Sequence, residues 1–474
     1  MNFMGYCQSL MPLQRIEKTM LDKITWRSTH ALSLLFIYFS VLICLTPPLQ
    51  SPDEFDHIKR AYALGEGTIF FRPQGNHSSG GMIDDGLNRY LALHEQLGLD
   101  PNHKVTATEL QQANELRWEG TKTFSATPAT AFYFPLIYAP QALALQFSQK
   151  LDLSINHSYY LTRVVASLTV LCLLAAAFSL TAPSPVTLAL LVMPMSVYQL
   201  SSTSLDAIAT GLSVLFISIF LKLLREPSQC NHGLFWLALA AFALLASSRL
   251  QLLPLFLLFP VLFLRDRNKL RLVASFTTLG LVCAWILIAG KYTVDHRVPS
   301  SISSSQVAFL YIQDPLALFH VMWVTLTDEA TLRGYFSSFL GMLGWLTAPF
   351  PGRTYIYLTS LILVISGLSI STEHIKINWR MNGLFFLIVM LSVFLILFAM
   401  LTTWTPYPSP RIIGVQGRYF LIPAILLSYV VFPAITALSG KRLLLILILL
   451  SGFTLYSLCI TIQLLLSRYY ISVV

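Results

Sequence analysis

The sequence predicts an all-α polytopic membrane protein, and two observations predict it: the overall composition and the length of the apolar segments. Of the 474 residues, 55% are hydrophobic and only 11% are charged, and the mean hydropathy is +0.66. Such values are typical of a chain that folds in lipid. A helix needs about 20 consecutive apolar residues to cross a bilayer. Runs of this length recur along the chain, for example at 444–466.

We expect about eleven transmembrane helices. They cover residues 31–48, 159–181, 184–200, 205–224, 233–248, 250–264, 272–290, 354–371, 382–401, 418–438 and 443–466. The segment 1–30 contains several Lys and Arg residues, and short loops rich in Lys and Arg stay in the cytoplasm. The N-terminal segment is therefore expected to be cytoplasmic, as are three later basic clusters around Lys222, Arg267 and Lys441.

One further apolar stretch, residues 131–147, is short and contains two prolines. If it crossed the membrane, all three later basic clusters would move to the outside, against the positive-inside rule. We therefore expect an interfacial segment, with a true proline-kinked span as the alternative. Residues 49–158 then form a large first extracytoplasmic loop that carries juxtamembrane helices. Residues 159–474 form a transmembrane bundle with external loops at about 291–353 and 402–417.

The charge and cysteine patterns exclude other classes of protein. The net charge of +9 resides mostly in short clusters between apolar runs rather than in a basic stripe with interleaved aromatics. We therefore expect the lipid bilayer as a partner and no nucleic acid. The six cysteines are scattered, without a CxxC or Cys/His cluster, so neither a disulfide framework nor a zinc site is expected.

The densest group of ionisable residues follows the first predicted span. Residues 51–54, Ser-Pro-Asp-Glu, match a helix start with a capping box. On such a helix Asp53, Asp56, His57 and Arg60 would share one face. A carboxylate beside the low-dielectric membrane can acquire a pKa suited to proton abstraction. The pattern fits either a capped surface helix or a catalytic centre.

Other candidate residues lie at the predicted ends of spans. Asp206 begins one span, Arg249 separates two apolar runs, and Arg418 begins another. Ionisable groups at such boundaries are candidates for function, and Arg suits a phosphate group. Helix capping and anchoring at the headgroup level are the alternative explanations. The full set of candidate substrate-binding residues is His57, Arg60, Tyr133, Arg163, Asp206, Gln251, Gln416 and Tyr419.

Four of these segments together resemble a known family. They are PDEFDHIKRAY (52–62), MSVYQLSSTSLDAI (195–208), SSRLQLLPL (247–255) and GVQGRYFLIP (414–423). The sequence resembles, over roughly residues 30–440, a bacterial membrane family long described only as a domain of unknown function. That family is similar to the GT-C class of polyprenol-phosphate-sugar glycosyltransferases and to the glucosyltransferases that decorate O-antigen. The fold expected from this resemblance is GT-C-like.

The resemblance implies an inverting transfer of glucose or a similar hexose from a polyprenyl-phosphate donor to an envelope glycan such as O-antigen. The active site would face the periplasm in a bacterial inner membrane. Asp53 and Glu54 match the family's acidic motif. Many relatives have PDEPAH where this chain has PDEFDH, so Asp56 is an additional carboxylate and the identity of the base stays open. Arg249 and Arg418 would bind the donor phosphate.

No metal is required by this chemistry, although the three carboxylates could hold Mg²⁺ or Mn²⁺ through their oxygens. A transporter or flippase of lipid-linked sugars is the main alternative function. A third is a non-catalytic subunit of an assembly complex for envelope polysaccharide. The charged candidates gather at one predicted membrane face, which favours a catalytic chamber over a path through the membrane.

Overall fold

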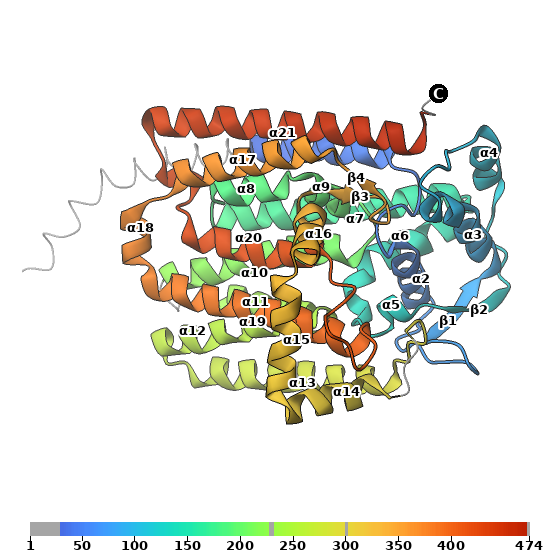
Figure 1. The fold of residues 1–474 in the computed structure, drawn as a ribbon, viewed down its shortest axis with the longest axis horizontal. Helices are drawn as coiled ribbons and strands as arrows, with labels where there is room; N and C mark the ends of the chain where they lie inside the picture. Colours follow the sequence, from blue (N-terminus) through green and yellow to red (C-terminus); the bar gives the residue numbers. More distant parts are fainter. Residues whose placement is uncertain (1–28, 227–231, 299–301, 472–474) are drawn as a thin grey trace, which may run out of the picture.

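The computed structural model describes residues 29–226, 232–298 and 302–471. The expected cytoplasmic segment, 1–30, lies almost wholly outside these residues. Long helices run side by side through most of the molecule, and smaller elements gather at one end (Figure 1). The described chain has only two small sheets, each of two antiparallel strands. The prediction of an all-helical, polytopic membrane protein is confirmed.

The number of spans differs from the prediction. Six helical segments of the described chain are long and apolar enough to cross a membrane, or seven if one sharply bent pair of helices counts as a span. The expected number of about eleven is therefore wrong. The six are α7 (Ile155–Leu180), α10 (Leu205–Arg225), α13 (Lys269–Tyr292), α19 (Trp379–Thr403), the segment Gly417–Ala437 and α21 (Gly440–Tyr469).

Proline explains two of the missing spans. The apolar run 184–200 folds as two short helices, α8 (Pro185–Leu191) and α9 (Pro194–Leu200), because proline cannot continue a preceding helix. The run 250–264 folds as a 3₁₀ helix, η4 (Leu250–Leu257), with a proline inside it, followed by α12 (Leu258–Asp266).

Length and polarity account for three others. The first helix, Thr29–Leu45, and α11 (His232–Ser248) each have 17 residues, which is short for a bilayer. Helix α17 (Gly352–Ser369) begins with an arginine and two tyrosines in its first two turns. Counting apolar residues therefore overestimated how many continuous helices the chain would form.

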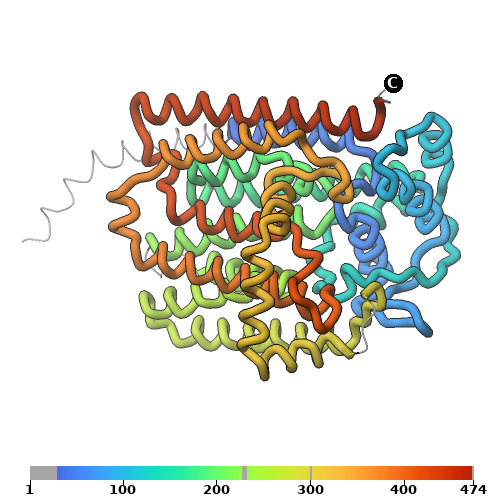
Figure 2. Tube along the Cα trace, in the orientation of Figure 1, coloured from blue at the N-terminus to red at the C-terminus, as the bar shows by residue number. Residues whose placement is uncertain are grey.

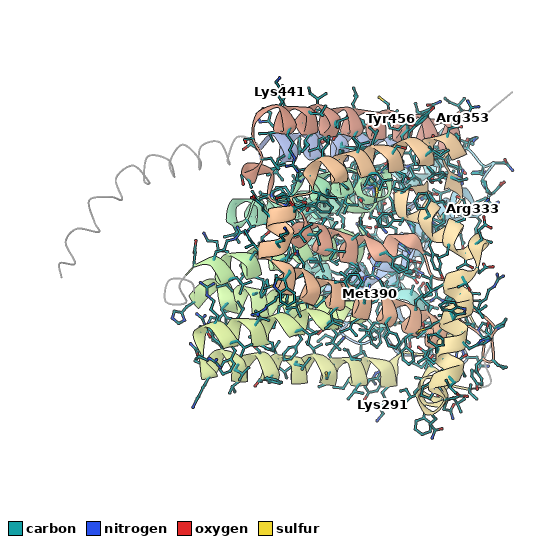
Figure 3. All side chains as sticks on the ribbon, turned by 60° about the vertical axis from the view of Figure 1, so that its left-hand side comes forward. Lys291, Arg333, Arg353, Met390, Lys441 and Tyr456 are labelled. Carbon is teal, nitrogen blue, oxygen red and sulfur yellow. The ribbon has the colours of Figure 1, made fainter. Side chains whose placement is uncertain are left out.

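Charged side chains mark the two ends of the bundle. Figure 3 shows Lys441 toward one end, Arg333 and Arg353 toward the other, and Met390 between them on the outer surface of α19. Helix α10 lies in the centre, and 89% of its most apolar 18-residue stretch is buried. In α13 the corresponding buried share is 17%. The peripheral helices thus present apolar side chains outward, as expected in lipid.

The first and last helices of the described chain lie against each other, in blue and red in Figures 1 and 2. The Tyr38 hydroxyl lies 3.0 Å from the hydroxyl oxygens of Ser457 and Thr461 on α21. This contact closes one side of the bundle.

The predicted first loop, 49–158, forms a folded unit at one end of the bundle, which we call the site end. It contains α2 (Glu54–Gly65), α3 (Asp85–Leu99), α4 (Ala107–Glu115), α5 (Pro128–Ala131), η2 (Pro135–Tyr138), α6 (Ala139–Lys150) and the antiparallel pair β1 (Gly80–Asp84) and β2 (Lys122–Ala126). The segment 131–147 is thus divided among three short helices. None of them is long enough to cross a bilayer.

The predicted loop 291–353 is also structured. It contains α14 (Ser304–Gln313), α15 (Pro315–Thr327), α16 (Glu329–Leu340), β3 (Met342–Leu343) and β4 (Ala348–Pro349). Helices α14 and α15 are the bent pair, at 105° to each other. Helix α15 runs across the long helices in Figure 1. The remaining elements are α18 (Thr372–Ile377), η5 (Gly417–Phe420), α20 (Leu421–Val431) and η6 (Ile435–Ala437).

Candidate functional site

The acidic segment begins differently from the predicted capping box. Helix α2 starts at Glu54, and its N-cap is Asp53, in the left-handed region with φ 60°. Only half of the box forms, because the Glu54 carboxylate accepts the Ser51 backbone N–H at 3.1 Å while the Ser51 hydroxyl is buried without a partner in the described structure. The Asp53 carboxylate does not cap the helix, so it is available to other groups.

Arg418 is one of those groups. Its side chain is buried in η5, and its Nη2 atom lies 2.5 Å from Asp53 Oδ2. Nη1 lies 3.5 Å from Asp206 Oδ2, and Nε donates to Gln416 Oε1 at 2.5 Å. The guanidinium also lies 5.2 Å from the ring centroid of Tyr419. Arg418 thus joins three candidate residues that are far apart in the sequence.

Gly417 fixes where Arg418 lies. Its N–H donates to the Ser338 hydroxyl of α16 at 2.8 Å. A Cβ atom added at Gly417 would lie 1.9 Å from the Tyr335 carbonyl oxygen, so the backbone of η5 touches the backbone of α16 here. Only glycine allows so close an approach.

Arg249 is the second arginine of the group. It precedes η4, forms an ion pair with Asp206, and donates to the Tyr133 hydroxyl at 3.2 Å. Asp206 also accepts from Gln199 Nε2 at 3.3 Å. The Nε atom of Arg249 is buried and has no hydrogen-bond partner among the described residues. We call Asp53, Asp206, Arg249 and Arg418 the arginine cluster.

Glu54 has a different environment from Asp53. It is fully buried, and its Oε1 atom accepts both the backbone N–H and the hydroxyl of Thr203, at 2.8 and 3.0 Å. With the bond from Ser51, its carboxylate oxygens hold three donors. Glu54 therefore ties the start of α2 to the loop that precedes α10.

The two aspartates differ in acidity. For Asp53, desolvation favours the neutral acid, but the charge and hydrogen bond of Arg418, together with further contributions from neighbours such as Arg297, lower the pKa below its usual value. For Asp56, burial raises the pKa to about 6, and Lys59, at 3.9 Å, offsets only part of this rise. Asp56 accepts the Ala129 N–H at 3.3 Å. Of these two residues, only Asp53 pairs with an arginine of the cluster.

His57 is buried in surroundings that favour the neutral imidazole. Burial lowers its pKa to about 3, and its Nδ1 atom lies 2.7 Å from the Tyr138 hydroxyl. Its ring also stacks 6.5 Å from the ring of Tyr133, which in turn contacts Arg249. The histidine thus connects α2 with η2 and the arginine cluster.

Three candidates lie outside the cluster. Arg60 is buried and donates to the backbone carbonyls of Ile69 and Tyr133, at 2.7 and 3.1 Å. Arg163 donates to the carbonyls of Thr46 and Ser201, at 2.8 and 3.0 Å. Such contacts tie segments of backbone together. Gln251 is half-buried at the start of η4, and within the described chain no hydrogen bond joins it to the cluster.

Sequence reasoning missed Arg297 and Gln199. Arg297 follows α13 in a loop whose His296 N–H donates to the Ser78 hydroxyl at 2.8 Å. Its guanidinium lies 4.7 Å from the Trp404 ring centroid, and its charge acts to lower the pKa values of Asp53 and Asp56. No motif surrounds Arg297 in the sequence, and only the fold brings it to the aspartates.

The three carboxylates of the acidic segment point to different partners: Asp53 to Arg418, Glu54 to Thr203 and Asp56 to Ala129. In the part of the chain that the structure describes, no group of three His, Cys, Asp or Glu residues is arranged to hold a metal ion. The donor set therefore does not form a preassembled Mg²⁺ or Mn²⁺ site.

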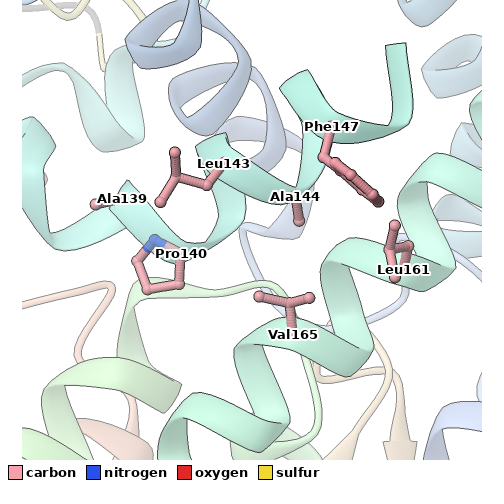
Figure 4. Close-up of a pocket in the computed structure, with 7 residues that line it drawn as sticks. All are labelled: Ala139, Pro140, Leu143, Ala144, Phe147, Leu161 and Val165. Atoms are coloured by element: carbon pink, nitrogen blue, oxygen red, sulfur yellow. The ribbon is translucent and has the colours of Figure 1, made fainter. Parts of the chain in front are cut away.

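An apolar groove lies between α6 and α7 (Figure 4). Its volume is about 540 Å³. The lining residues are Ala139, Pro140, Leu143, Ala144, Phe147, Leu161 and Val165. The groove begins at the residue that follows Tyr138, the partner of His57, so it adjoins the candidate site along the chain.

Fold and site together define a multi-pass membrane protein with a buried cluster of paired arginines and aspartates at one end of its helical bundle. A model of the family described as predicted membrane protein (DUF2142) matches residues 35–428. The chain belongs to this family. No curated protein and no solved structure matches the sequence.

Proposed function

We propose that the protein is an inverting glycosyltransferase that moves a hexose from a polyprenyl-phosphate donor to an envelope glycan, with its site end at the periplasmic face. The observation that carries the proposal is the arginine cluster. Two buried arginines share Asp206, and the Nε atom of Arg249 lacks a partner in the described structure, while Asp53 lies beside them with 42% of its side chain exposed.

Such a cluster suits a phosphate group. Arginine offers several N–H donors in a rigid plane that matches phosphate oxygens. The unpaired Nε of Arg249 is a buried donor whose desolvation is uncompensated, and an anionic oxygen would satisfy it. When the bond between the sugar and the phosphate breaks, its electron pair stays on the phosphate. Arg249 and Arg418 would stabilise the additional negative charge.

We assign the base to Asp53. It must accept the proton of the acceptor hydroxyl as the oxygen bonds to the anomeric carbon. In the free protein Arg418 keeps the Asp53 pKa low, which makes Asp53 a weak base. A phosphate that takes over Arg418 would release Asp53 and raise its pKa toward the working pH, where a base is most effective. Donor binding would thus prepare the base.

Glu54 has a positioning role in this proposal. Its two oxygens are already occupied by Ser51 and Thr203, and it is fully buried. It holds the start of α2 next to the loop before α10, and so places Asp53 close to Asp206. Asp56 has the higher pKa and a partly exposed side chain.

The groove between α6 and α7 would take the isoprenoid chain of the donor. Its lining is entirely apolar, and Leu143 and Phe147 at its rim are exposed on the surface of α6. An isoprenoid chain that enters the groove from the bilayer would keep its hydrocarbon in apolar surroundings. The arginines and the groove would then bind the two chemically different ends of one lipid phosphate.

Sugar transfer by the purified protein in detergent tests the proposal. The assay supplies a polyprenyl-phosphate hexose and a lipid-linked glycan acceptor, and follows the labelled sugar into the acceptor. Enzymatic transfer needs no sealed compartment, whereas a flippase moves its substrate only across an intact membrane. Absence of transfer in detergent, together with donor movement in sealed vesicles, would replace the proposal with the transport function.

A further inference from the structure

We call the bent pair α14 and α15 the elbow. Its sequence explains where each helix begins and ends and why the chain bends between them. Ser303 caps α14 through a full capping box with Gln306. Asp314 ends α14 and caps α15 by accepting the Ala317 N–H at 3.0 Å, and Pro315 then occupies the first turn. A residue before proline avoids helical geometry, so the chain must turn between the two helices.

The chain enters and leaves the region of the elbow at the site end. Before it, the Val294 N–H donates to the Ser79 hydroxyl, at 2.9 Å. After α16, the Gly344 N–H donates to the Tyr198 hydroxyl at 3.2 Å, and Trp345 Nε1 donates to the Leu49 carbonyl at 3.0 Å. Both connections are made at the site end. Helix α15, with 13 residues, is about 20 Å long, less than the roughly 30 Å of a hydrocarbon core.

Helix α15 has two apolar faces. The inner face packs in a separate small core, made of Val307, Tyr311, Val321, Leu397, Leu401 and Ile412. The outer face carries Leu316, Phe319 and Trp323, which are 81%, 64% and 58% exposed, together with the exposed His320. The rings of Phe319 and Trp323 stack one helical turn apart. The segment 304–327 contains no Lys, Arg or Glu; Asp314, at the bend, and His320 are its charged or chargeable residues.

We propose that the elbow lies in the plane of the membrane surface and inserts Leu316, Phe319 and Trp323 into the leaflet at the site end. An apolar face of this size is unstable in water. Aromatic side chains favour the boundary between headgroups and hydrocarbon. Helix α14 packs against α19, and the outer surfaces of α13 and α19 present apolar side chains such as Leu287 and Met390, so the elbow continues a lipid-facing surface.

The elbow also supports Arg418. The Ile412 N–H donates to the Thr325 hydroxyl of α15 at 2.8 Å, and the Gly417 N–H donates to Ser338 of α16. The segment 412–417 is thus held at both ends by the elbow and α16. A membrane-seated elbow therefore fixes the approach of the chain to Arg418. The placement of the elbow does not depend on the proposed function.

Spin labels test where the elbow lies. Single cysteines at Leu316 and Phe319, in a background without native cysteines, are labelled in reconstituted vesicles, and collision with oxygen and with a water-soluble nickel complex is measured. Two controls are Glu329, whose side chain is 85% exposed on α16, and Leu287, 73% exposed on α13. Labels at Leu316 and Phe319 should report equal, shallow depths between those of the two controls.

Three results would overturn the placement. Strong collision with nickel would put the elbow in water. Protection from both reagents would indicate a protein partner, such as a second copy of the chain. Depths at residues 316 and 319 that differ by about 4–5 Å, the rise of three residues along a spanning helix, would show a span.

The link to Arg418 is tested by hydrogen exchange on the variant Phe319→Asp, with Phe319→Tyr as the matched control. The aspartate should weaken lipid contact, and peptides covering 410–418 should exchange several-fold faster than in the Tyr variant. Peptides of α7 should be unchanged, which excludes general unfolding. Unchanged exchange at 410–418, when the introduced carboxylate has drawn the elbow out of the lipid, would refute the support of Arg418 by the elbow.

Discussion

Replacing Arg418 by methionine separates a structural from a catalytic role for this buried arginine. The change removes bonds to Asp53, Gln416 and Asp206. Breaking a buried ion pair costs about 3–5 kcal/mol when the remaining charge has no other partner. Here Asp206 keeps Arg249 and Gln199, and Asp53 can turn to water. We therefore expect a loss of unfolding free energy at the low end of this range, about 3 kcal/mol.

The loss of transfer activity in Arg418→Met should be larger than the loss of unfolding free energy alone would cause. Removing one donor that stabilises a developing negative charge lowers kcat by about 10²–10³-fold. The matched control is Arg163→Met, because Arg163 is equally buried but binds only backbone carbonyls. It should lower stability to a similar extent and leave kcat/KM unchanged in the folded fraction. Full transfer activity in folded Arg418→Met protein, or an equal kinetic loss in Arg163→Met, would refute the reasoning.

Three further predictions concern the carboxylates and the groove. Asp53→Asn should lower kcat by roughly 10²–10⁴-fold, measured as labelled-sugar transfer at saturating donor; kcat within about twofold of the parent would exclude Asp53 as base. Asp56 in the folded protein keeps its proton up to a pH of about 6, above its usual pKa of 3.8, so folding stability falls as pH rises through this window. Asp56→Asn should therefore be more stable than the parent above about pH 6, by up to roughly 3 kcal/mol, and equal to it near about pH 4 in denaturant titrations. A variant less stable than the parent at mildly alkaline pH would contradict this assignment. Val165→Trp should fill the groove and abolish any preference for long-chain over short-chain polyprenyl donors, while Leu168→Trp, on the exposed side of the same helix, should not; an unchanged chain-length preference would place the donor chain elsewhere.

Sequence reasoning located most of the cluster because its members stand at the boundaries of apolar runs. Asp206, Arg249 and Arg418 are each flanked by apolar segments, where an ionisable group is costly without a partner. The structure pairs these three with one another and with Asp53. The sequence could not assign the pairs, because each partner lies on a separate helix and pairing depends on helix packing.

Sequence reasoning predicted the wrong contacts where the local backbone conformation and the neighbouring helices determine what a side chain touches. The capping box predicted a helix from Ser51 onward, yet Asp53 adopts a left-handed conformation and Glu54 turns inward to Thr203. Spacing on a helical face also grouped Arg60 with the acids, whereas its guanidinium reaches backbone carbonyls in the interior. Spacing along a helix shows which side chains share a face, but the neighbouring helices determine what that face contacts.

Because η5 touches α16 at Gly417, a substitution at this position selectively tests the placement of Arg418. A single methyl group there would collide with the Tyr335 carbonyl and push η5 away from α16, without changing any charge. Gly417→Ala would therefore displace Arg418 while leaving its chemistry intact. Natural variation at this residue should be far more constrained than its lack of a side chain would suggest. The alignment of Arg418 would thus depend on the absence of one carbon atom in the residue before it.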